Sequence, residues 1–131
     1  MRKQPKGQSV IEAALLLPVF LYVFLGFVNL ALYGLVGLNA SNAAHYGARR
    51  GSVAQEDALA VAYEAAEAKL DQVSVGAYTV TVSGGGGRGN LIQITIDYQC
   101  PNFVPGLEKL LNLPPGGFQG RTVSFFRQEG W

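Results

Sequence analysis

Glu12 has the most distinctive chemical setting in this sequence, because it stands near the start of a long apolar run. Residues 13–48 contain no Asp, Glu, Lys or Arg. An acidic side chain at the centre of a membrane helix costs about 2.5–3.5 kcal/mol on insertion scales, and less toward a helix end. We therefore expect the Glu12 carboxylate to meet a positive charge that offsets this cost.

A short basic segment precedes Glu12. It carries Arg2, Lys3 and Lys6 and ends at Gly7, which has no side chain to obstruct a peptidase. We predict cleavage between Gly7 and Gln8, which removes residues 1–7 as a leader and makes Glu12 the fifth residue of the mature chain. The new amine of Gln8 would lie about 6 Å along the helix from residue 12. An intrachain ion pair and a pair with the amine of a neighbouring subunit both remain open.

Other residues that could do chemistry are isolated in the sequence. His45 is the only histidine and Cys100 the only cysteine, so an intrachain disulfide is impossible and no metal-ligand spacing exists. We expect Cys100 to be a buried or half-buried thiol, with an intersubunit disulfide as the minority alternative. A Cys–His nucleophile pair is formally possible. The glycine run at residues 84–89 lacks the lysine and the serine or threonine of a phosphate loop, which favours a linker. We expect no catalytic site, no metal and no cofactor.

The apolar run predicts a long N-terminal helix over residues 8–52. Its strongly apolar part, residues 10–38, would be about 43 Å long, whereas a bilayer core is about 30 Å thick. The helix can therefore cross a membrane, and the basic leader places the N-terminus in the cytoplasm. Pro18 predicts a local kink. Ala43, Gly47 and Gly51 recur every four residues, a spacing that lets helices pack closely.

The sequence predicts that residues 53–131 form a small domain, which we call the head. A capping box of Ser52 and Gln55 predicts a second helix over residues 53–71, either continuous with the first helix or broken near Gly51. Period-two alternation predicts antiparallel strands at 77–83, 91–99 and 121–127, with a short helix between the last two. The class is α+β, a helix on a three-stranded antiparallel sheet. The side chains expected inside are Tyr63, Val80, Val82, Ile92, Ile94 and Ile96.

The net charge of +1 argues against a nucleic-acid binder that works by phosphate neutralisation. The membrane is the expected partner instead. One alternative is a single-pass membrane anchor with a small binding domain, which leaves Glu12 and the preceding glycine unexplained. An enzyme is a third class, for which the sequence offers no site.

Two segments carry a family resemblance. Residues 7–18, Gly-Gln-Ser-Val-Ile-Glu-Ala-Ala-Leu-Leu-Leu-Pro, resemble the start of TadE-like proteins, the pseudopilins of tight-adherence (Tad or Flp) pili. Residues 42–49, Asn-Ala-Ala-His-Tyr-Gly-Ala-Arg, resemble the Gly-Ala-Arg segment that closes their N-terminal helix. His45 stands where a charged residue is usual in that family, and the head disulfides of many relatives cannot form with one cysteine.

The resemblance implies a minor pilin that a prepilin peptidase processes and that supports pilus biogenesis and adhesion. Its implied partners are other pilins and the Tad inner-membrane assembly proteins. Its implied location is the inner membrane, with the N-terminus cytoplasmic and the head periplasmic or extracellular, or the pilus itself. The resemblance also favours a neighbouring subunit's amine as the partner of Glu12. It does not separate the TadE, TadF and TadG-like branches.

Overall fold

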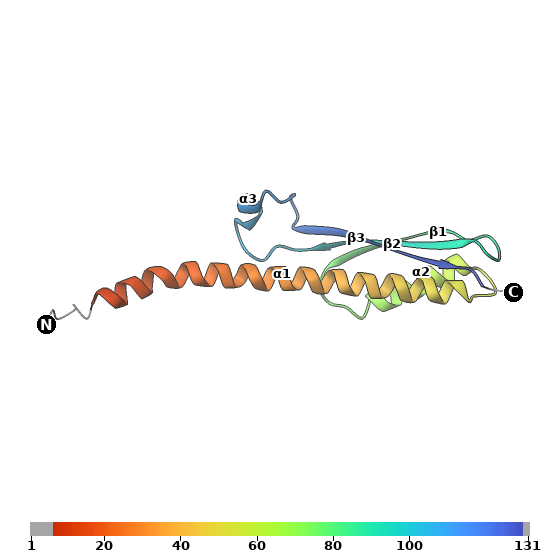
Figure 1. The fold of residues 1–131 in the computed structure, drawn as a ribbon, viewed down its shortest axis with the longest axis horizontal. Coiled ribbons are helices and arrows are strands. Elements are labelled where there is room, and N and C mark those ends of the chain that lie inside the picture. Colours follow the sequence, from red (N-terminus) through yellow and green to blue (C-terminus); the bar gives the residue numbers. More distant parts are fainter. Residues whose placement is uncertain (1–6, 130–131) are drawn as a thin grey trace.

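The computed structural model describes residues 7–129. Along the chain the elements are α1 (Gln8–Ser52), α2 (Ala58–Leu70), β1 (Ala77–Gly84), β2 (Leu91–Cys100), α3 (Leu107–Leu111) and β3 (Phe118–Arg127). Figure 1 shows α1 as a long spine, with the sheet and α2 flanking its C-terminal half. The predicted α+β class, with a long N-terminal helix and a three-stranded antiparallel sheet, is confirmed.

Helix α1 runs without a break from Gln8 to Ser52 and contains Pro18. Its first turns, red in Figure 1, are inclined to the axis of the remainder. Arg49 and Arg50 lie in the last turn, where positive side chains interact favourably with the negative end of the helix dipole.

The second helix begins later than the sequence predicts. Ser52 does not cap α2; it is the last residue of α1, and its hydroxyl donates a hydrogen bond to the Arg49 carbonyl at 2.8 Å. The N-cap of α2 is Asp57, whose carboxylate accepts from the Ala60 amide at 3.4 Å. The predicted capping box is therefore wrong, and the two helices are separate.

The sheet has the order β1-β2-β3, and both pairings are antiparallel. Strand β3 starts at Phe118, three residues before the predicted start. Gly120 interrupts the alternation there because it faces the ring of Tyr98, its partner on β2; a Cβ at Gly120 would lie 2.4 Å from that ring. A glycine in a strand commonly marks such a close approach.

The core lies between the inner face of the sheet and the two long helices. Ile92, Ile94 and Ile96 of β2 have no exposed surface, and Val80 and Val82 of β1 are half-buried. The helices meet these strands with small side chains. The fully buried alanines of this core are Ala40, Ala43, Ala44 and Ala48 of α1 and Ala62 of α2.

The prediction that Tyr63 is buried is wrong. Its side chain is 38% exposed, and its hydroxyl donates to Glu67 Oε1 at 2.8 Å. That hydrogen bond raises the pKa of Tyr63. The buried face of α2 consists of Ala58, Ala62, Ala66 and Leu70. A face built mostly of alanine lets α2 lie close to α1, and a tyrosine would hold the helices apart.

Candidate functional site

The predicted cleavage site lies at the start of α1. Gly7 is the N-cap residue and is exposed, and no atom of residues 7–129 lies within 4 Å of the place where its Cβ would stand. Its carbonyl accepts the first helical hydrogen bond, from the Ile11 amide at 3.2 Å. The bond between Gly7 and Gln8 therefore sits at the junction between helix and preceding chain. Residues 1–6 of the predicted leader lie outside the described residues.

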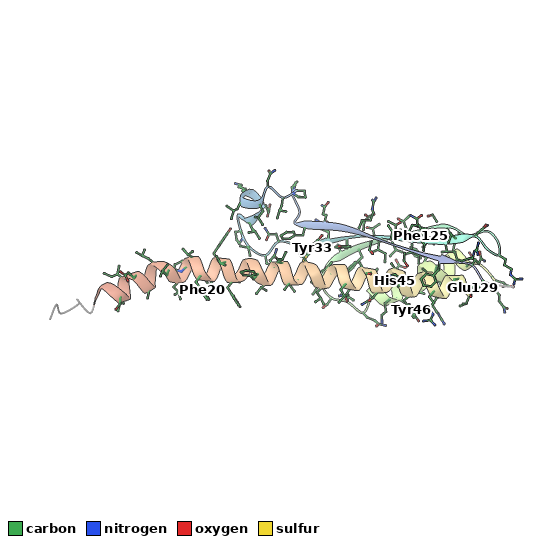
Figure 2. All side chains as sticks on the ribbon, in the orientation of Figure 1. Phe20, Tyr33, His45, Tyr46, Phe125 and Glu129 are labelled. Carbon is green, nitrogen blue, oxygen red and sulfur yellow. The ribbon has the colours of Figure 1, made fainter. Side chains whose placement is uncertain are left out.

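Glu12 lies one helical turn after Gln8, on an exposed part of α1. The surrounding surface is apolar on every side of the helix. Residues 9–25 are all exposed, including side chains as large as Leu15 and Phe20, each at 70%. Figure 2 shows Phe20 on the part of α1 that no strand covers.

A helix that is apolar all round needs lipid or protein around it. By length and composition, Ser9–Ser52 is long and apolar enough to cross a membrane, and its most apolar window is only 6% buried. The structure is thus compatible with a single-pass membrane anchor.

Two polar side chains of α1 mark where the head begins to cover the helix. The Tyr22 hydroxyl donates to the Pro105 carbonyl at 3.2 Å. The Asn29 carboxamide is 1% exposed, and its Oδ1 accepts from the Phe103 amide at 3.1 Å. Sequence reasoning missed Asn29. The available signal was an amide inside a run of apolar residues.

The small residues of the C-terminal half of α1 are buried. A Cβ at Gly47 would lie 2.7 Å from the Ala62 carbonyl oxygen, and one at Gly51 would lie 2.6 Å from the Ala62 Cβ. Gly47 also faces Ala66, whereas Gly51 faces Ala58, so the helices run antiparallel. This close approach is made with α2 of the same chain.

His45 and Cys100 have different partners. Nδ1 of His45 lies 3.0 Å from the hydroxyl oxygen of Ser124 on β3, which is 3% exposed. The Cys100 thiol is buried and donates to the Pro101 carbonyl at 3.7 Å. Burial raises the pKa of that thiol, so it is protonated at neutral pH. Within residues 7–129 no group of three His, Cys, Asp or Glu side chains could hold a metal ion.

Comparison with known families gives a match over the segment just described. Residues 7–49 match the family model described as TadE-like protein. The N-terminal segment is TadE-like. The resemblance drawn from the sequence is therefore confirmed, and it indicates a Tad pilus-associated protein that associates with pilus components and the membrane. No curated protein and no solved structure matches the chain.

The TadE-like match covers α1 almost to its end and stops before α2. It includes Gly7, Gln8 and Glu12 as well as Ala43 and Gly47, whereas Gly51 lies two residues beyond it. The shared feature is thus the long helix and its start, and the head has no counterpart in the match.

Proposed function

We propose that this chain is a minor pilin, or pseudopilin, of a Tad-type pilus. One observation carries the proposal: the TadE-like segment coincides with the helix whose N-terminal part is apolar on all sides and bare of head contacts. Such a helix is suited first to a bilayer and then to a bundle of similar helices in a filament. The chain acts by assembly and has no catalytic role.

On this proposal a prepilin peptidase cuts between Gly7 and Gln8. The exposed N-cap position of Gly7 supports this, since the peptidase can reach a bond at the end of a helix more easily than one inside it. The helix stays on the mature protein. It holds the chain in the inner membrane, with the N-terminus cytoplasmic and the head periplasmic or extracellular, until the chain joins other pilins and the Tad assembly proteins. Once assembled, the mature chain supports pilus biogenesis and adhesion.

Cleavage is the first step to test. We expect the mature protein, purified from membranes of cells that express the Tad machinery, to begin at Gln8. The variant Gly7→Leu should accumulate as uncleaved precursor in the membrane fraction because its side chain fills the space that the peptidase needs. The smaller change Gly7→Ala is the matched control and should be cleaved more completely.

N-terminal sequencing and intact mass measure the outcome. A chain that starts at Met1 would favour a membrane anchor unrelated to pili. Normal mature protein from Gly7→Leu would show that cleavage does not depend on this glycine.

A further inference from the structure

The segment between β2 and β3 forms a separate lobe on the side of the head that faces the bare part of α1. We call residues 101–117, which include α3, the α3 lobe. Figure 1 shows it beyond the end of the sheet, over the middle of α1. Val104 and Leu107 are its inner side chains, at 2% and 7% exposure.

Three further side chains of the α3 lobe are apolar and exposed. Phe103 is 61% exposed, Leu110 is 71% exposed and Leu111 is 53% exposed. Lys109 is exposed beside them. A group of large apolar side chains on one projecting lobe differs from apolar residues scattered singly over a surface, and such a group marks a contact with a partner or a membrane.

Contacts with α1 fix the level of the lobe along the helix. The hydrogen bonds of Tyr22 with Pro105 and of Asn29 with Phe103 hold the lobe beside residues 22–29. Between lobe and helix lies an open apolar groove of about 420 Å³. The side chains that line it include Tyr22, Phe27 and Leu30 of α1 and Leu107, Leu110 and Leu111 of the lobe.

This level coincides with the expected edge of a bilayer. Twenty residues of helix rise about 30 Å, the thickness of the hydrocarbon core. If the first turn of α1 lies at one surface of that core, the opposite surface falls near Val28, beside the lobe. Just beyond it Tyr33 packs against Phe118 and Tyr98, at centroid distances of 5.2 and 5.9 Å. Tyrosine is enriched at this depth because it has an apolar ring and a polar hydroxyl.

We propose that the α3 lobe is a membrane-interface element. It inserts Phe103, Leu110 and Leu111 into the head-side leaflet, and a lipid acyl chain occupies the groove against α1. Lys109 reaches the lipid headgroups while its stem lies on apolar surface. Lipid is the expected occupant because the groove opens directly onto the bare surface of α1, which lipid surrounds. The inference rests on the proposed function, in that α1 must span the bilayer.

The test uses the full chain reconstituted in phosphatidylcholine–phosphatidylglycerol vesicles that contain nitroxide-labelled lipid. A fluorophore is attached at Leu110→Cys, at Phe20→Cys as a membrane reference, or at Thr81→Cys on the exposed side of β1. Cys100 is buried, and the unchanged chain measures its background labelling. Leu111→Cys gives a second, independent reading of the lobe.

We expect nitroxide lipid to quench the labels at 20, 110 and 111 several-fold more than the label at 81, with shallow nitroxides most effective at 110 and 111. If the label at 20 is quenched but the labels at 110 and 111 are quenched no more than the label at 81, the inference is overturned, while the membrane-spanning helix still stands. Absence of quenching at 20 would refute the spanning helix, and the inference with it. A third outcome is that neither lipid nor aqueous quenchers reach the lobe labels until the protein is diluted in lipid. That result would show that a second copy of the chain covers the lobe, and it would overturn the inference.

Discussion

At Gly47, α1 closely approaches both α2 and the sheet. A Cβ there would lie 2.7 Å from the Ala62 carbonyl oxygen and 2.8 Å from both Ala66 Cβ and Ile94 Cδ1. Three neighbours on two different elements would have to move together, and one of them is backbone. Gly34, on the same helix, has no atom of the described part of the chain within 4 Å of the corresponding place.

Substitution by alanine should destabilise the protein at Gly47 but not at Gly34. Gly47→Ala should lower the free energy of unfolding by about 1–3 kcal/mol, because an overpacked site strains its neighbours. Gly34→Ala should leave stability unchanged or raise it by up to about 1 kcal/mol, since alanine is the better helix former. Thermal and denaturant unfolding of the detergent-solubilised chain measures both. Equal shifts in the two variants would contradict the packing described here.

For single residues, the sequence identifies those that a short, local sequence pattern marks. The spacing of Gly47 and Gly51 indicates close helix packing but does not name the partner. The hydrogen bonds of Asn29 with Phe103 and of His45 with Ser124 join residues 74 and 79 positions apart. Such pairs depend on how the head folds back along α1, and no local pattern encodes that.

Among the elements, β2 is the central strand and carries the most complete buried face. Burial alternates from Ile92 to Asp97, with Ile92, Ile94 and Ile96 inside and Gln93, Thr95 and Asp97 on the outer face. Asp97 is paired there with Arg121 of β3 through an Nε–Oδ1 contact of 2.6 Å. Both side chains of this pair are well exposed, so the pair contributes at most about 1 kcal/mol. The stability of the sheet therefore depends mainly on the isoleucines.

Substitution of neighbouring β2 residues should separate the two faces. Ile94→Ala removes a side chain with no exposed surface and should cost about 2–5 kcal/mol of unfolding free energy. Thr95→Ala is the matched control on the other face and should cost less than about 1 kcal/mol. Denaturant unfolding followed by tyrosine fluorescence and circular dichroism gives both values. Similar losses would mean that the two faces of β2 are equally buried.

Element boundaries were harder to predict than element types. The capping box of Ser52 and Gln55, a purely local signal, predicts that α2 starts at residue 53. Packing overrides it: α2 begins where Ala58 can lie against Gly51, and the chain needs residues 53–57 to reverse direction. The sequence pattern does not predict the early part of β3, because Gly120 breaks the alternation on which strand prediction depends.

For the molecule as a whole, α1 has two different surroundings along its length. The part before Tyr22 is bare and apolar, and the part from Asn29 onward carries the head. The periodic pattern of apolar residues in the sequence predicts the α+β class of the head. Its docking along α1 follows from contacts between distant segments, and the family match, which stops at residue 49, does not cover it.

Glu12 belongs to the whole molecule and its assembly because the family resemblance favours a neighbouring subunit's amine as the partner of its carboxylate. Glu12→Gln keeps the size of the side chain and removes its charge. The variant should insert into the membrane and be cleaved, yet it should fail to co-purify with the other pilins, since the amine of a neighbouring subunit would lose its counter-charge. Glu64→Gln, on an exposed position of α2, is the charge-matched control and should assemble normally. Membrane fractionation, intact mass and co-purification separate the three steps.

Normal pilus formation by Glu12→Gln would show that the carboxylate is not the docking group. An assembly defect in Glu64→Gln as well would point to net charge instead of position 12.

The arrangement of the sheet along α1 also has a mechanical consequence. Strands β2 and β3 both pack on α1, and Figure 1 shows them extended in the direction of its axis. From Asn29 to Ser52 the helix rises about 35 Å beside them. Tension that pulls on the first turns of α1 while the head is held would slide helix against sheet in shear. Contacts spread along that length would carry the load together and would not peel apart one after another, so the head should resist being pulled away from its own helix.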